Sequence, residues 1–125
     1  VSDEVVRCFE QCHVAVLEAN YDAELLETGK YPLALKNRIR NGKGHISNAQ
    51  ALDLFLHHKP DFMSHLFLGH ISKHNNSTVI VENTFNPVAG DVEIIIASRY
   101  RETKVYTIDG AGKAVTNKSP QLALF

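Results

Sequence analysis

Apolar residues along the chain form two kinds of pattern, short continuous runs and helical spacing, and together they predict an α/β fold. Residues 13–18 and 65–69 are continuous apolar runs, typical of strands buried on both faces. Helical spacing predicts helices over residues 3–11, 22–29, 32–41 and 47–59. Because these helices alternate with the strands, we expect them to cover a sheet.

Capping residues set the predicted helix boundaries. Ser47 and Gln50 have the spacing of a capping box, in which each side chain satisfies a free backbone N–H group. Asp22 can cap the second helix, Pro32 suits the first turn of the third, and Gly42 can end it.

The C-terminal third of the chain is less regular. Residues 76–86 fit either a strand or a helix. The β-branched residues at 78–81 favour a strand, whereas the spacing of Val81 and Phe85 permits a helix. Residues 92–97 and 104–108 are predicted strands, which could pair as a hairpin across 101–103. We therefore predict a domain over residues 1–110 and a polar tail over 111–125, frayed until Leu122.

Composition changes this picture little. The chain has 125 residues, 44% of them hydrophobic, and a formal charge of −1, which neither favours nor excludes nucleic acid as a partner. No apolar run suits a membrane span and no signal peptide is visible, so we expect a cytoplasmic protein. Cys8 and Cys12 fit buried thiols in a reducing compartment better than a metal pair. Because Val1 stands where Met is usual and Ser2 can already cap a helix, we expect a processed start or a piece of a longer protein.

Two of the seven histidines are candidates for chemistry. His70 follows a buried strand, and the carboxyl ends of strands gather ligands in α/β sheets, so it could bind zinc; otherwise it is a satisfied polar residue at the sheet edge. His45 lies two residues before the capped helix. It could donate a proton to a leaving oxygen there, or be an ordinary loop histidine.

The other five histidines are better explained by structural roles. His57 and His58 end a helix, where a positive charge complements the dipole. His13 and His65 open strands. His74 lies four residues beyond the strand-end histidine, a spacing that could bind metal on a helix, but a loop is expected there.

A basic run lies just before His45. Its cations suit contacts with phosphate, although a solvated helix face is the usual meaning of such a run. Because the run lies next to His45, we weigh phosphate binding and a solvated helix face equally. The residues of the run are Lys36, Arg38, Arg40 and Lys43.

Four segments, in order, resemble one family. Residues 18–22, 31–36, 42–48 and 69–76 resemble metallo-β-lactamase-fold hydrolases, in particular the YycJ-like subgroup of predicted nucleases, which is related to tRNase Z. The resemblance covers about residues 1–108. It implies one half of a four-layer αββα sandwich, with a mixed sheet covered by helices.

The resemblance also implies roles for single residues. His70 matches the last metal-ligand histidine. His45 matches a histidine linked, in the tRNase Z relatives, to proton donation to the leaving group. Residues 18–22 match a turn near the site, and Asn75 and Asn76 match a subgroup signature to which no role is assigned.

Most of the family's metal ligands are absent from this sequence. The His-x-His-x-Asp-His motif, the next ligand histidine and the bridging aspartate are all missing. The parent enzyme would use two zinc or manganese ions to activate a water for attack on a phosphodiester, and this chain would hold an incomplete site. We therefore expect an inactive fragment of a nuclease, whose partners are the missing N-terminal half and nucleic acid as substrate.

Two alternatives remain open. The parent could hydrolyse an ester or thioester outside nucleic acid, because one fold serves many substrates. The chain could instead be a non-catalytic half-domain that self-associates through apolar strand faces at 14–17 and 66–68.

Overall fold

A single sheet of parallel strands organises the molecule. The computed structural model describes residues 1–41, 44–108 and 123–124. Strand order in the sheet is β3-β2-β1-β4, and each pairing is parallel. The strands are β1 (Val14–Glu18), β2 (His65–Gly69), β3 (Glu93–Ile96) and β4 (Ala123–Leu124).

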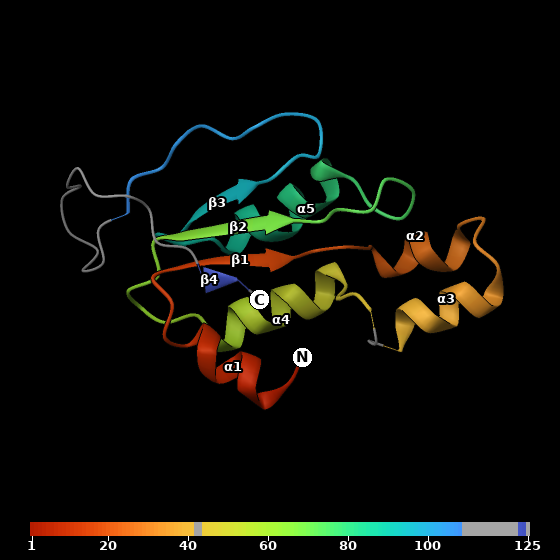
Figure 1. Cartoon of the computed structure of the whole chain (residues 1–125), viewed down its shortest axis with the longest axis horizontal. Coiled ribbons are helices and arrows are strands. Elements are labelled where there is room, and N and C mark those ends of the chain that lie inside the picture. Colours follow the sequence, from red (N-terminus) through yellow and green to blue (C-terminus); the bar gives the residue numbers. More distant parts are fainter. Residues whose placement is uncertain (42–43, 109–122, 125) are drawn as a thin grey trace.

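Helices lie on one face of this sheet and beyond its carboxyl edge. Figure 1 shows α1 and α4 beneath β1, and α2 with α3 past the point where β1 ends. The helices are α1 (Asp3–Phe9), α2 (Ala23–Thr28), α3 (Leu33–Arg40), α4 (Asn48–His58) and α5 (Thr78–Phe85), followed by the 3₁₀ turn η1 (Asn86–Val88).

The core lies between the sheet and helices α1, α4 and α5. Alternate side chains of β1 and β2 face these helices, and Leu17, Leu66 and Leu68 are at most 2% exposed. The rings of Phe55 on α4 and Phe85 on α5 meet edge-on beneath them, with centroids 6.0 Å apart.

An extended segment covers the opposite face. Tyr106 packs edge-on against Phe67 and His65, with both pairs of ring centroids 5.5 Å apart. Ile108 is also buried. Figure 1 shows this segment on the side of the sheet away from α4.

The predicted hairpin is therefore wrong. β3 pairs in parallel with β2, and no strand is assigned over residues 102–108. The segment uses its apolar side chains to cover a sheet face instead of extending the edge. The α/β class is confirmed. The predicted mixed sheet is wrong for the described residues, where every strand pairing is parallel: the connections from β1 to β2 and from β2 to β3 each contain a helix, so the next strand can run in the same direction.

Other local predictions fare unequally. The capping box is confirmed, with the Ser47 hydroxyl accepting from the Gln50 N–H and the Gln50 side chain accepting from the Ser47 N–H. Residues 78–85 resolve as helix, capped by Ser77. Cys12 is buried as predicted, but Cys8 is exposed, and it is Val5, Val6 and Phe9 of α1 that pack into the core.

Two further predictions concern the tail and the membrane. The frayed tail falls on residues outside the described ranges, apart from β4. In the described part of the chain, no helix has the length and apolar character needed to cross a membrane.

Candidate active site at the carboxyl ends of the strands

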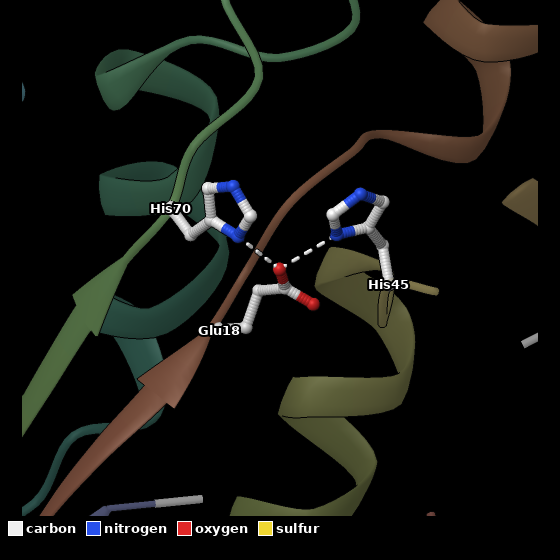
Figure 2. Close-up of side chains that lie close together, drawn as sticks. All are labelled: Glu18, His45 and His70. Carbon is white, nitrogen blue, oxygen red and sulfur yellow. Dashed lines mark hydrogen bonds and ion pairs between the residues drawn. The ribbon is translucent and has the colours of Figure 1, made fainter. Parts of the chain in front are cut away.

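One carboxylate, Glu18, joins the two candidate histidines. It is the last residue of β1, and its side chain is 19% exposed. His45 Nδ1–H donates to Glu18 Oε1 at 2.8 Å, and His70 Nδ1–H donates to the same oxygen. The other oxygen, Oε2, accepts from the Ile46 backbone N–H at 2.9 Å. Figure 2 shows both imidazoles turned toward this single oxygen.

His70 reaches this carboxylate through an unusual backbone conformation. Its φ is +54°, the only positive φ outside glycine among the described residues, and this left-handed region costs a side-chain-bearing residue about 1 kcal/mol. Asn20 Nδ2 donates to the His70 carbonyl at 2.7 Å and so holds the turn. Strain that is held in this way is typical of functional sites.

His45 is positioned by the segment that enters α4. Backbone bonds fasten this segment to the end of β1: Asn20 N–H donates to the Ile46 carbonyl at 3.0 Å, and Asn48 N–H to the Tyr21 carbonyl at 2.9 Å. The rings of His45 and His70 consequently lie edge-to-face, with centroids 5.0 Å apart.

A pair of buried asparagines locks these segments together. Asn48 Nδ2 donates to Asn76 Oδ1 at 2.9 Å, and Asn76 Nδ2 donates back to Asn48 Oδ1 at 2.8 Å. Asn76 Nδ2 also donates to the Ala19 carbonyl at 2.9 Å. The neighbouring Asn75 carbonyl accepts from the Asp22 N–H at 2.8 Å. The signature asparagines thus tie the segments after β1 and β2 to the start of α4.

A buried phenol adjoins this lock. Tyr21 is 4% exposed and bridges to Ser47 in a short parallel pairing. Burial raises the pKa of Tyr21, while its hydrogen bond to Ser47 and the charge of Arg40 partly offset the rise. We therefore assign Tyr21 a structural role beside the site.

Two cavities flank the His70 turn. One of about 440 Å³ adjoins His45, and one of about 680 Å³ adjoins His70. The segment of Ser72 and Lys73, together with Arg99, lines both. The two cavities therefore lie against the same short segment.

The described residues of the basic run lie in two different places, at the cavity beside His45 and against Glu27 of α2. Arg38 lines the cavity beside His45. Lys36 Nζ donates to the Glu27 carbonyl at 2.8 Å, and Arg40 forms an ion pair with the Glu27 carboxylate. Lys43 lies outside the described residues. Only part of the predicted phosphate-binding run is thus seen at the cavity.

The remaining histidines have local partners away from Glu18. His57 Nδ1 lies 3.0 Å from Asp53, His58 Nδ1 3.5 Å from Glu10, and His65 Nε2 3.3 Å from Glu93. The ring of His13 packs on Phe62, and that of His74 lies edge-on to Tyr31.

The trio of Glu18, His45 and His70 is chemically suited to hold part of a metal centre. Within the described ranges, it is the one group of three ligand-capable side chains, with atoms within 4.8 Å of one another. Because both Nδ1–H groups donate to Glu18, Nε2 is the atom of each ring that could bind a metal or carry a proton. A carboxylate that orients a histidine in this way is typical next to a bound metal. Three such groups do not complete a two-metal centre.

Sequence reasoning identified His45 and His70 but not the role of Glu18. The resemblance placed Glu18 only in a turn near the site. Its position as the last residue of a buried strand was the available signal, because that edge also carries His70.

Comparisons with known proteins support the resemblance. The chain is 36% identical over 76 residues to exodeoxyribonuclease WalJ of Streptococcus pneumoniae serotype 2, which is 61% of this chain and 28% of the relative. It is 34% identical over 76 residues to exodeoxyribonuclease YycJ of Bacillus anthracis, 61% of this chain and 29% of the relative. No family model and no solved structure matches the chain.

These matches confirm the similarity to YycJ-like exonucleases. The chain spans less than a third of the length of the curated relatives it matches.

Proposed function

We propose that this chain forms part of a metal-dependent nuclease that cleaves phosphodiester bonds, contributing the metal ligand His70 and the proton donor His45. The observation that carries the proposal is the single Glu18 carboxylate that holds both imidazoles at the carboxyl edge of the sheet. The printed names of the similar proteins, all exodeoxyribonucleases, support nucleic acid as substrate.

The fold fits one half of an αββα sandwich, with the rest of the metal ligands outside these 125 residues. Two facts support this. The match covers only 28–29% of each relative, and one trio of ligand-capable side chains is too few for two metals. The missing half is then the first partner of this chain, and the isolated chain is inactive.

His70 would hold metal through Nε2, with Glu18 fixing the ring from the other side. Zinc and manganese both accept imidazole, and two bound ions would neutralise charge on the phosphate. The hydrogen bond that His70 Nδ1–H donates to Glu18 favours the tautomer that leaves Nε2 available.

His45 would supply the proton that the leaving oxygen needs. A carboxylate that accepts from Nδ1–H fixes the orientation of the ring. The 2.8 Å bond to Glu18 provides this, and Nε2 is then the atom that donates. Arg38, which lines the same cavity, would bind a substrate phosphate, with Lys36, Arg40 and Lys43 as further cations near it.

A reducing compartment such as the cytoplasm suits the two free cysteines, of which Cys8 is exposed.

Metal binding by the chain itself tests the role of His70. Calorimetric titration with zinc should show weak binding that His70→Ala abolishes. His57→Ala, on the exposed end of α4, should leave binding unchanged. Equal binding by the chain and its His70→Ala variant would overturn the ligand assignment.

Hydrolysis tests the rest of the proposal. The chain alone should not cleave a labelled DNA strand, and rapid cleavage would contradict the incomplete centre. In the complete protein, His45→Ala should lower kcat about 10²–10⁴-fold, the usual contribution of a general acid.

A further inference from the structure

The cavity beside His45 has two chemically different walls. It occupies about 440 Å³, within the range of small-molecule sites. One wall is formed by Tyr31, which lies just before α3, and by Leu35 and Ile39 of α3. Lys73 and His74, from the segment after β2, form the other. A ligand seated here would touch an aromatic and aliphatic surface on one side and polar groups on the other.

The apolar wall has the character of a stacking surface. Tyr31 is half-buried, and its ring meets that of His74 edge-to-face at 63°, with centroids 6.2 Å apart. The two rings therefore form a corner instead of a closed stack. Leu35 is 37% exposed, although an aliphatic side chain at a helix centre is usually covered. These groups offer a flat, apolar partner to a ring such as a nucleobase.

Three cationic side chains line the cavity. Arg38, Lys73 and Arg99 line it, and none of the described lining residues is acidic. Arg99 is held in place by donating to the Ile71 carbonyl at 3.0 Å. On α3, Lys36 and Arg40 contact Glu27, so Arg38 is the cation of that trio that lines the cavity. Cations without acidic neighbours favour an anion such as phosphate.

We propose that this cavity is a subsite for one unpaired nucleotide, with the base against Tyr31 and its phosphate at Arg38, Lys73 and Arg99. A base paired in a duplex presents its faces to stacked neighbours, so only an unpaired base can enter between the two walls. Since His45 also lines the cavity, the bound nucleotide would lie next to the bond that is cleaved. That last placement rests on the proposed function.

The subsite would make the enzyme selective for single-stranded or frayed ends. Stacking on an aromatic ring tolerates any base, because every base has a flat apolar face. We therefore expect little sequence preference at this position and a strong preference for an unpaired nucleotide over a bare phosphate.

Nucleotide binding to the chain tests the subsite without any turnover. Calorimetry in a chelator compares a deoxynucleoside 5′-monophosphate with inorganic phosphate, so the metal plays no part. The nucleotide should bind more tightly. Tyr31→Ala should weaken nucleotide binding about fivefold to a hundredfold, the range for stacking of one base, and leave phosphate binding unchanged. Tyr31→Phe should retain it.

Two further variants, one in the cavity and one outside it, distinguish loss of a specific contact from general misfolding. Arg38→Ala should weaken both ligands, whereas Arg7→Ala, an exposed cation on α1, should weaken neither. Equal affinity for the nucleotide and for phosphate, or binding insensitive to Tyr31→Ala and Arg38→Ala, would overturn the subsite.

The experiments distinguish failure of the proposed nuclease function from failure of the nucleotide subsite. If the complete protein does not cleave DNA but the chain binds nucleotide through Tyr31, the proposed function fails and the subsite stands. If the protein cleaves DNA and Tyr31→Ala changes neither KM nor nucleotide binding, the subsite fails alone.

Discussion

At the scale of single residues, Glu18 determines how both histidines can act. Its carboxylate accepts two Nδ1–H groups through one oxygen and a backbone N–H through the other. The two rings are therefore oriented by one charge, and a change at Glu18 should alter both His45 and His70.

Glu18→Gln should weaken zinc binding about tenfold to a hundredfold, the usual effect of losing a group that orients a metal-bound histidine. The amide keeps the shape of the side chain but loses its charge and half of its acceptors. Competition with a chelating dye measures the affinity. Asp53→Asn, which neutralises an exposed partner of His57, is the matched control. Unchanged affinity in Glu18→Gln would show that the carboxylate does not orient His70.

Cys12 should make stability fall in mild alkali. Burial first, and the nearby Cys8 second, raise the pKa of its thiol above the ordinary value. The native state therefore holds this proton more tightly than the unfolded chain does. The resulting stability is complete below the ordinary thiol pKa, about 8.5, and is lost as pH rises through the folded value.

Urea unfolding at pH 8 and pH 9.5 measures this loss. Cys12→Ala should show a smaller decrease in the free energy of unfolding between the two pH values than the unchanged chain does. Cys8→Ser should retain most of the decrease, because Cys8 is exposed. An identical decrease in all three proteins would refute the role of Cys12.

The sequence revealed the histidines but not the carboxylate that joins them. Among the seven histidines, His45 and His70 stand out because each flanks a recognisable boundary, a capped helix or a strand end. Glu18 is one acidic residue among fourteen acidic residues, and its partners lie 27 and 52 positions away. Such long-range pairing leaves no local pattern.

At the scale of elements, the site is supported by the way that helices and strand ends are bonded together. The reciprocal amides of Asn48 and Asn76 connect the start of α4 to the segment after β2, and Asn76 also reaches the segment after β1. Both side chains are buried, so each lost bond leaves a polar group without water.

Asn76→Ala should lower the free energy of unfolding by about 1–3 kcal/mol, the cost of leaving buried partners unsatisfied. Asn48→Ala should cost a similar amount. The double variant should lose less than the sum, because one pair of bonds is shared. Denaturation with urea measures all three, with the exposed Asn83→Ala as control. Additive losses would contradict the pairing.

Local signals predicted elements well where the chain caps its own ends. Ser47 and Gln50 fixed the start of α4 because both partners of the capping box lie within four residues. The strand predicted over residues 104–108 was wrong. Tyr106 and Ile108 have strand propensity, but the surface that they cover belongs to strands distant in the sequence. Propensity alone does not separate a strand from an extended covering segment.

At the scale of the whole molecule, the sheet has helices on one face and an extended segment on the other, while α2 and α3 project past its edge (Figure 1). No residue of α3 is buried, so that helix is held by its contacts with α2. The strand residues that we expected to be free for self-association, such as Val14, Leu17 and Leu66, are buried within the chain. Association through the sheet stays a prediction, and the half-buried Val16 is the kind of residue that would have to carry it.

The parallel order of the strands also governs how the molecule must fold. β1 meets β2 only when Val14 pairs with His65, so no neighbouring hairpin can nucleate the sheet. Long loops must close before these contacts repay their entropy, and chains of this kind fold slowly. Glu18 gains both imidazoles only after segments from three parts of the chain have arrived. We therefore expect the candidate site to be among the last structures to form, so that a partly folded chain would lack it.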